Sequence, residues 1–202
     1  MKKELSRNER SALIRKLTGA AMLTAIVVIL QLLGSFIRFG VFSVSLVLVP
    51  IVIGAALFGP WISAWLGLVF GVTVLLSGDA AAFLAYHIPG TIITVLLKGT
   101  LAGLAAGFVY RFVEKKNRYF ATLISAMICP LVNTGVFLLG CRVFQWDAVT
   151  DMGILNGYTD AALFAIVGLV GLNFIAEFVF NCVLTPVIVR LVDLIGKRFR
   201  RA

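Results

Sequence analysis

The sequence contains few charged residues. Asp, Glu, Lys and Arg make up only 13% of the 202 residues, whereas a soluble globular domain carries about a quarter. This scarcity excludes a soluble globule, and the 61% content of hydrophobic residues and the mean hydropathy of +1.06 point the same way. The composition therefore predicts an integral membrane protein. The net charge of +9 does not require a nucleic-acid-binding module.

Residues that commonly carry catalysis or hold metals are also scarce. His87 is the only histidine, and the three cysteines lie in apolar runs without the spacing of metal ligands. We expect the cysteines to be small packing residues that form no disulfide. The glycine-rich stretches lie within apolar runs, not in a loop followed by Lys-Ser or Lys-Thr, so no nucleotide-binding motif is present. Neither a cofactor nor a metal is predicted.

An acidic residue on the same predicted loop as His87 leaves an enzyme as an alternative. Asp79 lies eight residues before His87, and an acid near a histidine can transfer protons. The pair has no candidate nucleophile or metal cluster beside it. We therefore predict no enzymatic activity.

Six apolar segments are long enough to cross a bilayer, or are slightly shorter and bounded by turn residues. Phe58-Gly59-Pro60 separates the second from the third, since proline can open a helix but cannot continue one. The last segment exceeds the thickness of a bilayer, so it should tilt or project, and Pro186 is expected to bend it. We predict an all-α integral membrane protein with six transmembrane helices at residues 17–37, 41–58, Pro60–Ser77, 88–110, 119–143 and 162–194.

Basic residues gather on one side of the predicted bundle. Fifteen of the 18 Lys and Arg residues fall in the N-terminal segment, the loop after the fourth span and the C-terminal end. By the positive-inside rule both termini are cytoplasmic, and we expect a multi-pass protein of the cell membrane. The polar N-terminal segment leads into a full span, so it is not expected to be a cleaved signal peptide. We predict one membrane domain, with a cytoplasmic segment at 1–16, a bundle at 17–194 and a basic tail at 195–202.

The fourth span carries a single charge, Lys98, near its middle. A lysine at the centre of a membrane helix costs about 2.5–3.5 kcal/mol, so it normally faces a protein interior or a wet cavity. Thr91 and Thr94 share its face of the helix. A neighbouring face carries glycine at every fourth position, which predicts the close approach of another helix. These glycines are Gly99, Gly103 and Gly107.

Polar residues in four predicted spans fall at a similar depth. A rise of about 1.5 Å per residue puts Gln31, Lys98, Asn133 and Asn173 between the midplane and the outer third, and Glu177 follows Asn173 by one turn. One interpretation is structural, with Lys98 paired to Glu177 and the amides bonded between helices. Interhelical polar contacts contribute only about 0.6 kcal/mol on average. We therefore favour an outward-facing pocket for a polar small molecule.

The cytoplasmic half of the first span has a face of small residues. Ala21 and Ala25 are one turn apart, with Ala20 and Thr24 beside them. Such faces indicate close contacts between helices. Internal packing and docking onto a different membrane protein are both open.

Two stretches of the chain carry a family resemblance. The segment AMLTA at 21–25 is similar to an AxxxA docking motif, and LVPIVIGAALFGP at 48–60, with Gly67 and Gly71, is similar to a pattern of prolines and glycines. Both are features of the substrate-binding S components of energy-coupling factor (ECF) vitamin transporters, which the chain resembles most over residues 18–107. The resemblance implies capture of a vitamin or its precursor from outside. It also implies docking through the first helix onto a T component bearing two cytoplasmic ATPases. A solitary secondary transporter of a small polar metabolite is the alternative.

The resemblance also implies where a ligand binds. The family builds its site from the first outward loop and the outer halves of the last three helices. Trp146 and Tyr158 are candidates for stacking on a heterocycle, although an interfacial aromatic belt is an alternative role, and Arg38 is alternatively a headgroup anchor. Pantothenate, biotin and riboflavin are all compatible with such a site. The predicted binding residues are Gln31, Arg38, Lys98, Asn133, Asn173, Glu177, Trp146 and Tyr158.

Overall fold

Long helices dominate the protein, because a chain in a bilayer must satisfy its backbone hydrogen bonds within each segment. The computed structural model describes residues 7–35, 38–39, 42–43 and 46–201. Within them, five helical segments are long and apolar enough to cross a membrane. They are Glu9–Gly34 within α1 (Arg7–Gly34), α3 (Pro60–Ser77), α5 (Ile88–Val113), α6 (Arg118–Phe144) and Ala161–Leu194, which ends within α9 (Leu172–Arg201).

The second predicted span, at 41–58, is wrong as a continuous helix. Its helical part, α2 (Leu48–Phe58), has 11 residues and is therefore about 16 Å long, roughly half the hydrocarbon thickness. Ahead of it, β1 (Arg38–Phe39) pairs antiparallel with β2 (Phe42–Ser43). Most of α2 is buried in the bundle. Its apolar sequence thus reflects burial within the protein, and a sixth span of full length is not found in the described chain.

Two glycine-bearing helices, α3 and α5, lie against each other with their backbones in contact. A Cβ atom added to Gly99 would overlap the carbonyl oxygen of Gly67, and one added to Gly103 would overlap the carbonyl oxygen of Ser63. Gly107 stands equally close to the backbone of Pro60. The close helix approach predicted from the glycine face is confirmed, and its partner is the third span.

Side-chain hydroxyls add further links between the packed helices. Ser63 Oγ donates to the carbonyl of Ile51 at 3.0 Å, which joins α3 to α2. Ser125 Oγ donates to the carbonyl of Ala106 at 3.0 Å, which joins α6 to α5. Three short helices complete the fold: α4 (Ala81–Leu84), α7 (Trp146–Leu155) and α8 (Ala161–Leu163). The sequence predicted loops at α4 and α7, whereas α8 falls at the start of the predicted last span.

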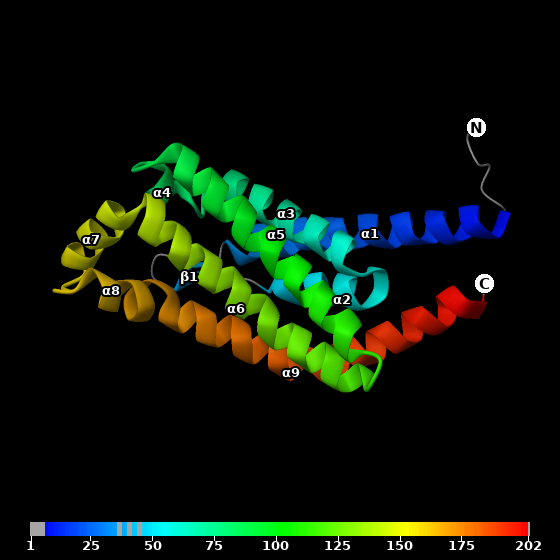
Figure 1. The fold of residues 1–202 in the computed structure, drawn as a ribbon. Coiled ribbons are helices and arrows are strands. Elements are labelled where there is room, and N and C mark those ends of the chain that lie inside the picture. The colour runs from blue at the N-terminus through cyan, green and yellow to red at the C-terminus, as the bar shows by residue number, and fades with distance from the viewer. Residues whose placement is uncertain (1–6, 36–37, 40–41, 44–45, 202) are drawn as a thin grey trace.

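The last span begins with an unusual helical segment. A π-helix, η1 (Phe164–Gly171), connects α8 to α9, and such wider turns often occur at functional sites. Asn173 and Glu177 follow in the first two turns of α9. Further along, α9 continues through Pro186 and changes direction in its C-terminal part (Figure 1).

The two ends of the bundle differ in charge. In Figure 1 the start of α1, the end of α9 and the connection between α5 and α6 lie toward one end, whereas α4, α7 and α8 lie at the other. The first end carries the basic segments of the sequence. The opposite end contains a small hydrophobic cluster around Phe83, Phe137 and Phe164, separate from the main core.

Candidate substrate-binding site

A polar cavity of about 50 Å³ lies where the main hydrophobic core meets the smaller cluster. Its walls come from α1, α3, α4, α5, α6 and α9, together with the connections after α3 and α6. The lining residues are Gln31, Phe70, Val74, Asp79, Ala80, Phe83, Thr91, Thr94, Val95, Lys98, Asn133, Phe137, Gln145, Asn173 and Glu177.

Lys98 occupies the wall formed by α5, between two aromatic rings. Its Nζ atom lies 5.7 Å from the ring centroid of Phe70 and 5.0 Å from that of Phe137. Cation–π contacts at such distances stabilise an ammonium away from water. The carboxylates of Glu177 and Asp79 add an electrostatic attraction. Lys98 therefore places its amino group at the cavity wall, beside two aromatic rings.

Asn133 on α6 and Asn173 on α9 bring two amides to the same cavity. Asn173 Nδ2 donates to Glu177 Oε1 at 3.2 Å, one turn along α9. This bond fixes the orientation of the amide, because only its nitrogen can donate to the carboxylate. Among the described residues, the Oδ1 atoms of Asn133 and Asn173 are buried without a hydrogen-bond partner, as is Thr94 Oγ1.

Asp79 contributes a carboxylate that the sequence analysis did not place in the pocket. Gln31 Nε2 donates to Asp79 Oδ2 at 2.7 Å, and Ser77 Oγ donates to the same oxygen at 3.1 Å. Gly78, at φ 83°, ends α3 in a left-handed conformation, so the chain reverses at the residue before Asp79. That Gly-Asp pair after a span is the signal that could have found it.

His87 has a structural partner that is distinct from Asp79. Its Nδ1 atom accepts a hydrogen bond from the Gly90 backbone N–H at 2.9 Å and caps the start of α5. Its ring also stacks on Phe144, with the centroids 6.1 Å apart. Asp79 is engaged by Gln31 and Ser77 as described. This geometry gives no support to an acid–base pair formed by the two residues.

Gln145 is a second lining residue that sequence reasoning missed. Only 3% of it is exposed, and its Nε2 atom donates to Thr91 Oγ1. Cys141 Sγ lies 3.8 Å from its Oε1 atom. Gln145 falls in the junction between α6 and α7. The predicted spans leave this junction in an outward loop. The periodicity of a helix therefore could not be used to predict that the Gln145 side chain is buried.

Two of the remaining predicted binding residues, Trp146 and Tyr158, lie outside the cavity. Trp146 packs against Arg142, whose guanidinium carbon is 4.5 Å from the ring centroid, and Tyr158 contacts the ring of Phe164 at 5.2 Å. Neither residue lines the cavity. The side chain of Arg38 lies outside the described part of the structure, so its predicted role stays a prediction.

The small-residue face of α1 is only partly turned away from the bundle. Ala20 is buried, and Thr24 Oγ1 accepts a hydrogen bond from Trp65 Nε1 of α3 at 3.3 Å. Ala21 and Ala25 are exposed, whereas Leu23 and Val27 on the other side of the helix are buried. The two alanines therefore do not serve internal packing in this structure. These two alanines are exposed to another molecule.

The fold and the cavity together define a class: a helical membrane protein with a cavity lined by polar side chains between its spans. A family model described as "ECF transporter, substrate-specific component" matches residues 15–189. The chain belongs to this family and is a substrate-binding component of a transporter. Members of the family are transporter subunits, not enzymes. A search of curated proteins finds no match to the chain.

Proposed function

We propose that the protein is the S component of an ECF-type importer, and that it captures a vitamin or vitamin precursor from outside. It delivers the ligand inward when coupled to a T component and two cytoplasmic ATPases. The observation that carries this proposal is the set of unpartnered buried atoms around the cavity, namely Thr94 Oγ1, Asn133 Oδ1 and Asn173 Oδ1, together with the Lys98 ammonium at the same wall.

Unpartnered buried polar atoms are costly and therefore informative. Each costs about 1–3 kcal/mol relative to a hydrogen-bonded state, and native proteins contain only a few. Three around one cavity are explained if a ligand supplies the missing partners. The amide oxygens of Asn133 and Asn173 accept hydrogen bonds, so the ligand must bring N–H or O–H donors. Lys98 donates, so the ligand must also bring a carbonyl or carboxylate.

The apolar part of the cavity wall further restricts the kinds of ligand that can bind. Phe70, Phe83 and Phe137 line the cavity beside the polar groups, and aromatic faces suit a flat or branched apolar moiety. The cavity of about 50 Å³ is small compared with typical ligand sites of about 300–1,000 Å³. Binding of a vitamin-sized molecule therefore requires the surrounding helices to move apart.

The direct test is to purify the protein from cells grown in rich medium, denature it, and identify any released small molecule by mass spectrometry. We expect a compound that combines hydrogen-bond donors, a carbonyl or carboxylate and an apolar moiety. Transport of that compound into liposomes is expected only when the T component and both ATPases are present. Uptake by the purified chain alone would contradict the proposal and favour a solitary secondary transporter.

Replacing Thr94 with valine should raise the stability of the protein and lower its affinity for the ligand. The change removes the unpartnered hydroxyl and keeps the shape of the side chain, so we expect the free energy of unfolding to rise by about 1 kcal/mol. Affinity for the identified compound should fall about fivefold, the equivalent of one lost hydrogen bond. Thermal unfolding in detergent and equilibrium binding measure the two effects.

The matched control is Thr100→Val on the same helix. Thr100 Oγ1 donates to the Leu96 carbonyl at 2.7 Å, and Thr100 does not line the cavity. This variant should leave ligand affinity unchanged. Equal affinities of the Thr94→Val variant and the unmodified protein would show that the cavity does not hold the ligand.

The exposed alanines of α1 allow a test of whether the T component docks on this helix. Ala25→Trp adds a large side chain to the small-residue face, so a helix can no longer approach closely there. We expect this variant to retain ligand binding and to lose co-purification with the T component. Leu33→Trp is the control, because Leu33 is also exposed on α1 but lies about two turns away. If Ala25→Trp retains the partner, docking does not use this face.

A further inference from the structure

A second cavity, of about 390 Å³, lies near the start of α1 and the connection from α5 to α6, and its lining includes no residue of α7 or α8. It is formed by α1, α2 and α9, together with the end of α5, the start of α6 and the connection between them. Its floor is apolar and includes the buried residues Tyr110 and Val192. Its other lining residues include Arg15, Lys16, Arg118 and Glu114, so three positive charges face one negative charge.

The basic side chains of this wall come from the first part of α1 and from the start of α6. Arg15 and Lys16 belong to the charged first part of α1, and Arg118 begins α6. Long basic side chains near the ends of membrane helices reach the headgroup region while their alkyl stems rest on apolar surface. Basic pockets between membrane helices are suited to anionic lipid headgroups.

We propose that this cavity binds the phosphate of an anionic phospholipid, with Lys16, Arg15 and Arg118 contacting the headgroup and the apolar floor contacting the start of the acyl chains. A lipid fits both surfaces at once, whereas a free phosphate ion would use only the basic wall. With the basic end of the bundle cytoplasmic, the lipid belongs to the inner leaflet.

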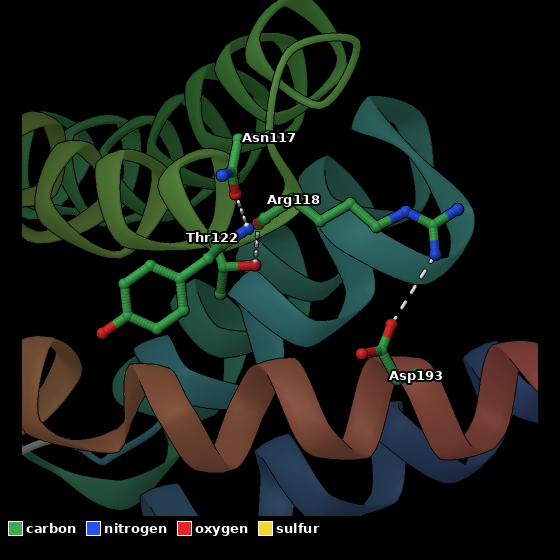
Figure 2. Close-up of polar contacts among 5 residues, drawn as sticks. Asn117, Arg118, Thr122 and Asp193 are labelled. Carbon is green, nitrogen blue, oxygen red and sulfur yellow. Dashed lines mark hydrogen bonds and ion pairs between the residues drawn. The ribbon is translucent and has the colours of Figure 1, made fainter.

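Two carboxylates adjust the strength of this site. Glu114 lines the cavity, and Asp193 on α9 forms an ion pair with Arg118, with 3.6 Å between Asp193 Oδ1 and the guanidinium nitrogen. Figure 2 shows Arg118 extending from the start of α6 to Asp193. Both side chains are about half exposed, so the pair contributes little to stability. A phosphate group competes with Asp193 for the same guanidinium.

The test uses native mass spectrometry of the full-length protein in detergent with an equimolar mixture of phosphatidylglycerol and phosphatidylcholine. The unmodified protein should retain phosphatidylglycerol in preference to phosphatidylcholine. Lys16→Gln should weaken phosphatidylglycerol binding about fivefold, the effect of one basic residue near an anionic surface. Glu114→Gln and Asp193→Asn should strengthen it. Lys116→Gln is the control, because Lys116 lies in the same loop as Glu114 but does not line the cavity.

Four outcomes would overturn the proposal. The first is equal retention of the two lipids, and the second is an equal effect of Lys16→Gln and Lys116→Gln. The third is displacement of phosphatidylglycerol by inorganic phosphate alone, which would assign the site to a free anion. If Lys16→Gln leaves lipid retention unchanged and instead abolishes co-purification with the T component, the cavity is a protein contact and the lipid assignment is wrong. Circular dichroism of each variant verifies folding.

Discussion

Lys98→Met is expected to lower affinity for the co-purified ligand by about 10–150-fold. A hydrogen bond to a charged group contributes about 1.5–3 kcal/mol, and Lys98 is the cation at the wall of the polar cavity. Methionine replaces most of the apolar stem of the lysine but is one atom shorter. It loses the ammonium that lies over the rings of Phe70 and Phe137, and it cannot donate a hydrogen bond. Isothermal titration with the compound identified by mass spectrometry measures the change.

A double substitution distinguishes this role from a structural one. If Lys98 serves mainly to neutralise Glu177, its loss destabilises the protein by about 3–5 kcal/mol, because a buried charge is left uncompensated. Lys98→Met combined with Glu177→Gln should then restore both stability and binding. We expect instead that the double variant folds and does not bind. Lys98→Arg keeps the charge and should retain more affinity for the ligand than Lys98→Met. Unchanged affinity of the methionine variant would contradict the prediction that Lys98 binds the ligand.

Gly103→Ala is expected to cost about 3 kcal/mol of stability or to prevent folding. The added Cβ would overlap the carbonyl oxygen of Ser63 on the facing helix. Overpacking in a core costs about 1–3 kcal/mol even where side chains can shift, and here the obstacle is backbone. Because α3 and α5 would separate, Phe70 and Lys98 would also move apart. Thermal unfolding in detergent measures the loss.

Gly135→Ala provides the matched control on another membrane helix. Nothing lies within 4 Å of the Cβ position at Gly135 on α6, and alanine favours helix by up to about 1 kcal/mol over glycine. We therefore expect the unfolding temperature to stay the same or to rise. If both variants lost stability equally, glycine would be needed for helix flexibility and not for the contact between α3 and α5.

Much of the architecture was predictable from local sequence. The third predicted span coincides with α3, since Gly59-Pro60 and Gly78 bound it. The glycine spacing in α5 predicted a close helix contact that the structure contains. Family membership, inferred from the small-residue segment in α1 and the proline and glycine pattern of 48–60, is confirmed by the match over residues 15–189.

The part of the fold that could not be predicted involves segments whose environment is set by distant residues. Apolar composition does not distinguish a helix that faces lipid from one that is buried in protein, so α2 was assigned as a span although it has 11 residues. The same limitation applies to α7, where the sequence indicated only a loop. The number of full spans in the described chain therefore became clear only from the structure.

The candidate site also has a part that the sequence predicted and a part that it did not. Depth along each helix follows from counting residues, so the sequence alone brought Gln31, Lys98, Asn133 and Asn173 to one level. It did not show that Asp79 bonds to Gln31, or that Gln145 bonds to Thr91. It also could not separate Trp146 and Tyr158 from the cavity wall.

The physical reason is that a helix has a fixed period and rise, whereas the contacts between helices depend on how their faces meet. Sequence by itself determined that the chain lies in a membrane and to which family it belongs. It also determined which faces of its helices consist of small residues and which are polar. Tertiary structure decided which helix packs against the glycine face of α5 and which loop residues complete the polar cavity. It also decided that the basic residues Lys16 and Arg118 line the same second cavity.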